Sequence, residues 1–265
     1  MSSPFLKWAG GKRWLASSMR LPIPESYNRY VEPFLGGGAI FFQLSPDRAI
    51  LADINQELIN LYQVMRDTPK ELESLMTEHQ ARHSTRHYYK MRAKIPDGTI
   101  AQAARMLYLN RTCWNGLYRV NLRGEFNVPI GTKSTVTMKG ESFADLSRSL
   151  KKAKIVCQDF SVTLKTVREG DFVFVDPPYT VKHNLNGFLK YNERIFSWSD
   201  QVRLRDAVVL AAERGAYIVV TNADHESVQE LYADFEYRKL ARASVLAADE
   251  GKRCSTSEAM FIIKL

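Results

Sequence analysis

The sequence predicts an α/β fold whose order of elements is interrupted in the middle. Short runs of apolar, β-branched or aromatic residues alternate with stretches of helical periodicity, which is typical of a sheet flanked by helices. The expected strands lie at 30–34, 48–53, 154–158, 172–176, 216–221 and 259–264. Between the second and third strands only helix and turn signals occur. We therefore expect one domain built from 1–56 and 154–265, with an inserted lobe at 57–153.

Helices are predicted from the spacing of apolar residues together with start and stop signals. They are expected at 39–44, 55–66, 69–82, 100–110, 143–151, 199–214 and 225–232. His79, His83 and His87 recur every fourth residue and would line one helical face. A polar, solvated face explains these histidines better than a zinc site, because no Cys, Asp or Glu completes a local ligand set.

Composition and charge bound the class of protein. The 265 residues are 45% hydrophobic, enough for one good core and a modest appendage, and no apolar run approaches the roughly 18 residues of a membrane span. The three cysteines are scattered and suit neither a disulfide framework nor a Cys-x-x-Cys metal site, so we expect a soluble, cytoplasmic protein without bound metal. The net charge is +8, and the stretch 110–155 holds nine basic side chains against three acidic ones. Such a concentration favours a polyanionic partner.

The sharpest motif is the tetrapeptide Asp176-Pro177-Pro178-Tyr179, which follows the apolar run 172–175. It places an acid, two rigid residues and an aromatic ring at the carboxyl end of a strand, where ligands gather in open α/β sheets. The amino group of adenine is a poor nucleophile, and acceptors on its hydrogens favour the pyramidal nitrogen with a localised lone pair. Asp176 supplies one acceptor, the carbonyl of Pro177 another, and Tyr179 a ring that stacks on the base. The alternative is an ordinary turn after a strand, where Asp-Pro and Pro-Pro are common.

Two further motifs suit a nucleotide-type cofactor. The turn from Phe34 to Gly38 contains three glycines, which let the backbone come close to a ligand. Asp53 ends the next strand, where a carboxylate can accept hydrogen bonds from ribose hydroxyls. Trp8 and Lys12 flank two glycines and combine a π surface with a cation. The alternatives are an ordinary turn between strand and helix for the glycines and a helix N-cap for Asp53.

Signals for a β-hairpin stand in the inserted lobe. Asn115-Gly116 and Arg123-Gly124 are turn sequences between alternating runs, so we expect a ribbon that presents Arg119, Arg123 and aromatic side chains outward. Arginine reads guanine in the major groove, and an aromatic side chain fills the gap left by a flipped base. The alternative is a solvated basic hairpin with its aromatic side chains in a small core of its own.

Seven blocks of sequence, in this order, resemble the Dam family of DNA adenine methyltransferases. They are Phe5 to Lys12, Glu32 to Gly38, Leu51 to Asn55, Leu109 to Arg111, Asn115 to Arg119, Gly124 to Pro129 and Asp176 to Tyr179. The resemblance implies a Rossmann-like methyltransferase sheet with an inserted, mostly helical target-recognition lobe that carries a β-hairpin. It implies S-adenosyl-L-methionine as the cofactor and double-stranded DNA as the partner. The implied reaction is methyl transfer to the 6-amino nitrogen of an adenine flipped out of the duplex, at GATC.

The motifs and the resemblance together assign roles to individual residues. The catalytic positions are Asp176, Pro177, Pro178 and Tyr179. The cofactor-binding positions are Trp8, Lys12, Phe34, Gly36, Gly38, Asp53, Asp159, Phe160 and Asp176. The DNA-binding positions are Lys7, Arg111, Trp114, Asn115, Leu117, Arg119, Asn121, Arg123 and Pro129. By resemblance, Lys7 and Arg119 contact guanines, whereas Leu117 and Pro129 touch the middle bases of GATC.

Two features depart from the family pattern. Trp114 stands where the best-known members carry a tyrosine that inserts into the duplex, and the segment 180–193 does not follow their sequence. The tetrapeptide also suits the amino group of an RNA adenine or of cytosine. A DNA-binding regulator that uses the cofactor only as a ligand is a third interpretation. We expect a monomer in solution.

Overall fold

The computed structural model describes residues 4–18, 20–121, 124–137, 140, 142–182, 196–242 and 256–265. The chain divides into two compact units. The first unit consists of Met1–Leu21 and Leu35–Gln158, and the second of Pro22–Phe34 and Asp159–Leu265. The assignment of 57–153 as an inserted recognition domain, with 1–56 and 154–265 as the catalytic domain, stays a prediction.

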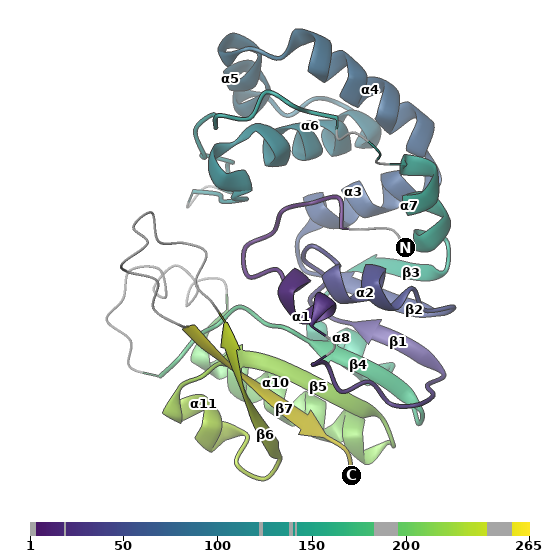
Figure 1. Cartoon of the computed structure of the whole chain (residues 1–265), viewed down its shortest axis with the longest axis vertical. Coiled ribbons are helices and arrows are strands. Elements are labelled where there is room, and N and C mark those ends of the chain that lie inside the picture. Colours follow the sequence, from purple (N-terminus) through teal and green to yellow (C-terminus); the bar gives the residue numbers. More distant parts are fainter. Residues whose placement is uncertain are drawn as a thin grey trace. The chain divides into compact units, whose positions relative to one another are not determined.

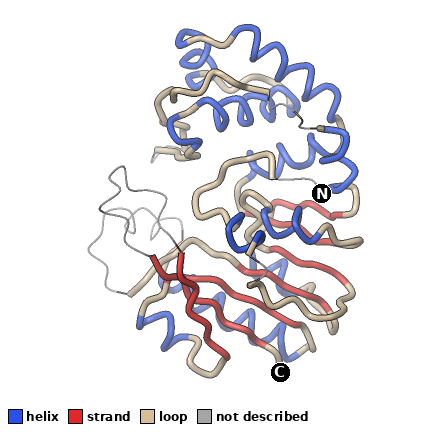
Figure 2. The backbone as a smooth tube through the Cα atoms, viewed as in Figure 1, coloured by secondary structure: helices blue, strands red, loops and turns tan. Residues whose placement is uncertain are grey.

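The described residues contain seven strands, shown in red in Figure 2. They are β1 (Arg29–Glu32), β2 (Ala49–Asp53), β3 (Ala153–Cys157), β4 (Asp171–Val175), β5 (Tyr217–Ala223), β6 (Glu236–Arg242) and β7 (Thr256–Ile263). The strand order is β3-β2-β1-β4-β5-β7-β6 (Figure 1). Strands β2 and β3 pair in parallel, as do β1, β4 and β5, whereas β7 is antiparallel to both β5 and β6. The predicted α/β class is confirmed.

The strands form where the sequence concentrates buried apolar side chains. Every residue of β4 is at most 1% exposed, as expected of a parallel strand that is covered on both faces. Strand β6 escapes prediction because the residues from Glu236 to Lys239 are exposed and mostly charged. It lies at the end of the sheet, where charged side chains disfavour pairing with a further strand.

The described part of the first unit contains seven α-helices. They are α1 (Arg13–Ser17), α2 (Ala39–Leu44), α3 (Gln56–Asp67), α4 (Pro69–Arg82), α5 (Thr85–Ala93), α6 (Thr99–Thr112) and α7 (Phe143–Leu150). Helix α3 lies against β2, β3 and α6, and α6 also contacts α4 and α5. Asn55 caps α3 by accepting a hydrogen bond from the N–H of Leu58 at 3.0 Å, and Pro69 opens α4.

The expectation that His79, His83 and His87 share one helical face is wrong. Helix α4 ends before His83, and Ser84 caps a new helix by accepting a hydrogen bond from the N–H of His87 at 3.2 Å. The imidazoles instead gather around Tyr108 of α6, whose ring centroid lies 4.7 Å from that of His79, 5.8 Å from that of His83 and 5.3 Å from that of His87. They form a half-buried aromatic cluster rather than a solvated face.

The second unit contributes the helices α8 (Phe160–Lys165), α10 (Trp198–Glu213) and α11 (Glu226–Leu231). Helix α10 packs against α8 and β5. It begins one residue before the predicted Ser199, because Ser197 and Asp200 form a capping box in which each side chain accepts a hydrogen bond from the other residue's backbone N–H. Over the residues placed by the structure, no helix is both long enough and apolar enough to span a membrane.

Candidate functional site

In the first unit, Asp53 ties the glycine-rich turn to the end of β2. Its carboxylate accepts hydrogen bonds from the backbone N–H of Gly36 (to Oδ2, 3.0 Å) and of Asn55 (to Oδ1, 3.0 Å). Gly36 and Gly38 adopt φ angles of 46° and 63°, a region that favours glycine. Asp53 is not the N-cap of α3, because Asn55 holds that position. Burial raises the pKa of the Asp53 carboxyl, although the N–H donors counteract part of this effect.

Trp8 lies against the same turn. A Cβ placed on Gly36 would be 2.8 Å from Cδ1 of Trp8, so the glycine is required for the indole to approach the backbone. The ring of Tyr118 stacks on the indole, with centroids 5.1 Å apart and planes at 20°. Lys12 is 3% exposed, and its Nζ donates to the carbonyl of Gly10 at 2.9 Å. The expected cofactor residues of this unit therefore form an ordered backbone turn, an aromatic face and a partly buried carboxylate.

In the second unit, the tetrapeptide follows β4 and is held by side chains from other strands. Thr221 of β5 donates from Oγ1 to Oδ1 of Asp176 at 2.7 Å. The hydroxyl of Tyr179 donates to Oε2 of Glu258 in β7 at 2.9 Å. Thr221 is 0% exposed and Glu258 7%, so both partners are buried. The acid and the ring of the motif are thus fixed by residues distant in sequence.

The carbonyl of Pro178 is ordered in a similar way. Gln201 of α10 donates from Nε2 to the carbonyl of Pro178 at 3.2 Å, and Asn222 donates to the side-chain oxygen of Gln201 at 3.0 Å. Pro177 is buried and Pro178 is partly exposed. Burial and two neighbouring carboxylates raise the pKa of Tyr179 well above its ordinary value, so its phenol stays neutral. An ordered carboxylate and a neutral ring can together hold an amino-substituted base.

The remaining cofactor candidates of the second unit are engaged in contacts of their own. Asp159 caps α8 and accepts hydrogen bonds from both terminal nitrogens of Arg203, at 2.8 and 3.1 Å. Burial opposes ionisation of Asp159, but Arg203 and Ser161 outweigh it and lower the pKa of Asp159 to about 2. Arg203 also lies over the ring of Phe160, 4.2 Å from its centroid, and Phe34 stacks on that ring at 5.4 Å. At 4% exposure, Phe160 is mainly a packing residue.

The predicted ribbon is present in the lobe as two isolated antiparallel bridges. Cys113 pairs with Ile130, and Val120 pairs with Phe126. The turn at Asn115 has a left-handed φ of 56°, which asparagine tolerates better than most residues. Figure 1 shows this region as a loop rather than as arrows, since neither bridge extends into a strand.

Most of the expected DNA-contacting side chains lie on the surface of this ribbon. Trp114 is 53% exposed, and Asn115, Arg119 and Pro129 are also exposed. Arg119 donates from Nε to the side-chain oxygen of Asn127 at 3.1 Å. Two further members are partly exposed: Leu117 and Asn121, the latter donating to Glu125 at 2.8 Å. Arg123 lies outside the described residues.

Arg111 does not fit the expected DNA contact. It is 5% exposed and donates to the carbonyls of Val136 at 2.9 Å and Phe5 at 3.3 Å. A guanidinium that is buried against backbone carbonyls stabilises the fold and is not available to a phosphate or a base. Arg111 of the Leu109-Asn110-Arg111 block is therefore a buried residue that stabilises the fold, not a surface contact to DNA.

Asn110 of the same block positions Lys7. Its Oδ1 accepts from the N–H of Lys7 at 3.1 Å, and its Nδ2 donates to the carbonyl of Lys7 at 2.7 Å. Gly116 lies directly beside the Lys7 side chain, because a Cβ at that position would overlap it. The neighbouring amine of Lys133, followed by burial, lowers the pKa of Lys7. Two amines held this close favour an anionic or electron-rich partner.

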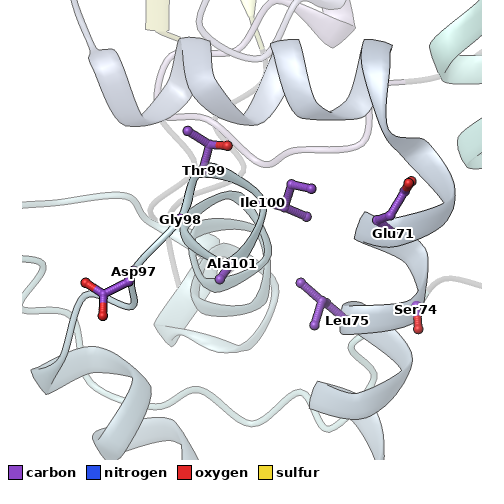
Figure 3. Close-up of a pocket in the computed structure, with 8 residues that line it drawn as sticks. All are labelled: Glu71, Ser74, Leu75, Asp97, Gly98, Thr99, Ile100 and Ala101. Atoms are coloured by element: carbon purple, nitrogen blue, oxygen red, sulfur yellow. The ribbon is translucent and has the colours of Figure 1, made fainter.

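The hollow in Figure 3 has a volume of about 580 Å³ and lies between α4 and the start of α6. It is lined by Glu71, Ser74, Leu75, Asp97, Gly98, Thr99, Ile100 and Ala101. None of these is a candidate site residue, and its two carboxylates disfavour an anionic ligand. Within the described ranges, no group of three or more His, Cys, Asp or Glu residues is placed to hold a metal ion.

Sequence reasoning missed the residues that hold the motifs in place. Thr221, Glu258 and Arg203 carry no motif, and only Thr221 had a signal, since it ends a predicted strand as Asp176 does. Tyr118 was expected to point outward with the other aromatic side chains of the ribbon, but it stacks on Trp8. That expectation is wrong because the ring finds a larger apolar partner inside the unit.

Comparison with known proteins identifies the family. Residues 8–245 match the family described as D12 class N6 adenine-specific DNA methyltransferase. The Type II methyltransferase M1.LlaDCHI of Lactococcus lactis subsp. cremoris is 39% identical over 264 residues, covering 96% of this chain and 93% of the relative. The Type II methyltransferase M.MjaIII of Methanocaldococcus jannaschii is 33% identical, with 94% of each chain covered. The DNA adenine methylase of Escherichia coli K12 is 28% identical, with 98% of this chain and 95% of the relative covered.

These matches confirm the resemblance to the Dam family. They span nearly the whole chain and include the glycine-rich turn, the ribbon and the tetrapeptide. The chain therefore belongs to the D12 class of N6 adenine-specific DNA methyltransferases, a family whose members methylate adenine in DNA and whose chemistry implies S-adenosylmethionine as the methyl donor.

Proposed function

We propose that this protein transfers a methyl group from S-adenosylmethionine to the 6-amino nitrogen of adenine in duplex DNA, at GATC, with the target adenine flipped out of the helix. The observation that carries the proposal is the ordered tetrapeptide, in which Thr221 orients Asp176 and Glu258 orients Tyr179. Membership of the family supports adenine as the base. The choice of GATC rests on the resemblance of the ribbon to that of the Dam family.

The acceptors of the tetrapeptide activate the amino group. The adenine nitrogen is a weak nucleophile while its lone pair is conjugated with the ring, and acceptors on both hydrogens favour the pyramidal form that can attack. In the proposed complex the carboxylate of Asp176 accepts a hydrogen bond from one amino hydrogen, and the carbonyl of Pro177 accepts one from the other. Thr221 fixes the carboxylate, and the proline ring restricts the backbone. The ring of Tyr179 stacks on the base while its hydroxyl stays anchored on Glu258.

The residues present fit the methyl donor. When bound, S-adenosylmethionine would supply an electrophilic methyl carbon on its sulfonium, and transfer of that methyl to the adenine nitrogen would leave S-adenosylhomocysteine and release one proton to solvent. The carboxylate of Asp53 can accept hydrogen bonds from the ribose hydroxyls of the donor, and the face of the Trp8 indole can attract its positive charge. The proposal assigns cofactor contact to Trp8, Lys12, Gly36, Gly38, Asp53 and Asp176. Phe34, Asp159 and Phe160 are assigned a supporting role through their mutual packing and the ion pair with Arg203.

The proposal assigns sequence reading to the ribbon and to Lys7. An arginine donates two parallel hydrogen bonds to O6 and N7 of guanine, which suits the exposed Arg119. Leu117 and Pro129 are assigned to the middle bases. Trp114, 53% exposed, is assigned to the space that a flipped adenine leaves in the duplex.

Methylation of a plasmid of mixed sequence tests the proposal. The protein is incubated with the plasmid and a radiolabelled methyl donor, and the DNA is digested to nucleosides for mass spectrometry. A second portion is mapped by single-molecule sequencing. We expect N6-methyladenine confined to GATC. N4-methylcytosine or no turnover would refute the reaction, whereas N6-methyladenine at another sequence would refute only the GATC assignment.

A further inference from the structure

Tyr118 occupies a special place in the first unit, because it belongs to the ribbon yet contacts the expected cofactor residue Trp8. The ribbon backbone is extended at Leu117, with φ −82° and ψ 113°. Successive side chains of an extended chain point to opposite sides. Leu117 and Arg119, the neighbours of Tyr118, therefore face away from it, and Tyr118 turns inward to stack on Trp8 at 5.1 Å.

Glu57 anchors the hydroxyl of Tyr118. Its Oε2 accepts the Tyr118 hydroxyl at 2.6 Å, and its Oε1 lies 3.7 Å from the guanidinium of Arg105. Arg105 is 4% exposed and donates to the carbonyls of Met91 at 2.7 Å and Arg92 at 3.0 Å. Burial, followed by the charge of Glu57, raises the pKa of Tyr118, so the phenol stays a donor. The acceptor is therefore held by residues that belong to helices.

On its other side, Trp8 is joined to the glycine-rich turn. A Cβ on Gly36 would lie 2.8 Å from the indole, and the N–H of Gly36 donates to Asp53 at 3.0 Å. The carbonyl of Gly36 accepts the hydroxyl of Tyr62 at 3.1 Å. If the indole moved toward the turn, it would meet the backbone of Gly36, whose N–H and carbonyl are both held by hydrogen bonds.

We propose that Tyr118 and Glu57 are positioning residues that couple recognition of the target sequence to the hold on the cofactor. The inference rests on the proposed function, in that Trp8 contacts the cofactor and the neighbours of Tyr118 contact the bases. A ribbon seated on its cognate site fixes Tyr118, and the stacked ring then fixes Trp8 against the glycine-rich turn. Because coupling between two binding sites is reciprocal, the cofactor must strengthen binding to the cognate sequence by the same factor.

The experiment measures that factor without turnover. S-adenosylhomocysteine, the unreactive product, is titrated calorimetrically into the full-length protein saturated with a GATC duplex, and into the protein saturated with a duplex in which both guanines are changed. We expect the ratio of the two dissociation constants to be about fivefold or more in the parent. Tyr118→Leu, which removes the stack, should bring it to within about twofold of unity.

Conservative variants separate positioning from general destabilisation. Tyr118→Phe keeps the stack and loses the bond to Glu57, so its ratio should lie between those of the parent and Tyr118→Leu. Glu57→Gln keeps an acceptor and should restore most of the ratio lost in Glu57→Ala. Tyr89→Leu is the matched control, because Tyr89 is 38% exposed in the same unit and packs only on Arg92 and Tyr88 among the described contacts. Its ratio should equal that of the parent.

The outcomes are distinct. A parent ratio near unity, or a parent ratio retained in Tyr118→Leu and Glu57→Ala, overturns the coupling while binding itself stays intact. A parent that binds no S-adenosylhomocysteine with either duplex overturns the proposed function and the coupling with it. Equal losses in Tyr118→Leu and Tyr89→Leu would make Tyr118 an ordinary packing residue.

Discussion

Replacement of Thr221 by valine should slow methyl transfer by about ten- to a hundredfold. The hydroxyl of Thr221 lies 2.7 Å from Oδ1 of Asp176 and is 0% exposed, so no water replaces it when it is removed. A hydrogen bond to a charged group contributes about 1.5 to 3 kcal/mol, and each 1.36 kcal/mol of lost transition-state stabilisation is about tenfold in rate. Valine has nearly the shape of threonine, so the packing of β5 is retained. The lower rate would then come from the lost orientation of the Asp176 carboxylate. Replacement of Asp176 itself by alanine should cost at least about a hundredfold.

The assay is single-turnover transfer of a radiolabelled methyl group to a GATC duplex at saturating enzyme. Thr112→Val is the matched control, since Thr112 is also 0% exposed and its hydroxyl donates at 2.7 Å to a backbone carbonyl, that of Tyr108. Both variants should be destabilised to a similar extent in thermal unfolding, but only Thr221→Val should have a lower rate constant of methyl transfer. A Thr221→Val rate within about twofold of the parent would refute the view that this hydroxyl orients the catalytic carboxylate.

Three further predictions address the cofactor, the target sequence and pH. Asp53→Ala should weaken S-adenosylhomocysteine binding by about 1 to 3 kcal/mol in calorimetry, and unchanged affinity would remove Asp53 from the site. Arg119→Lys keeps the positive charge but loses the planar pair of donors of the guanidinium. The ratio of methylation rates on GATC and on sites with an altered guanine should therefore fall by about tenfold or more, while the salt dependence of binding stays the same. If instead the rates on all sites fell in proportion, Arg119 would be a contact to the DNA backbone. Burial, then the charges of His87 and Arg82, lowers the pKa of His79 to about 4. An unfolded imidazole titrates near 6.5, so the unfolded state binds more protons between about pH 6.5 and pH 4, and stability is lost as the pH falls through that window. The free energy of unfolding of His79→Phe should fall less than that of the parent over this range. If the two free energies fell in parallel from pH 7 to 4.5, the lowered pKa of His79 would be contradicted.

The sequence by itself determined every described strand except β6, the turns and the chemistry of the motifs. Strand β4 is predicted because its residues 172–175 are buried on both faces and are all apolar. The tetrapeptide, the glycine-rich turn and the Asn115 turn are local, since each depends on conformations that Pro, Gly and Asn adopt over a few consecutive residues. Patterns of this kind reflect burial and backbone preference along one segment, and both can be inferred from neighbouring residues.

Only the tertiary structure decided which distant side chains meet. Thr221 reaches Asp176 because β5 pairs in parallel with β4, with Val220 in register with Val175. Glu258 reaches Tyr179 from β7, at the far end of the chain. The same holds for the burial of Arg111, which looks in sequence like one more basic residue of the recognition lobe.

The stack of Trp8 on Tyr118 shows the physical reason. The two residues lie far apart in the sequence, and nothing near either one predicts the other, because the energy of such a contact depends on the path of the backbone between them. Periodicity predicts which face of a segment is apolar, but it cannot predict which of several apolar surfaces covers that face. That choice depends on the packing of the whole unit, and here it turns Tyr118 toward Trp8 while Arg119 remains exposed.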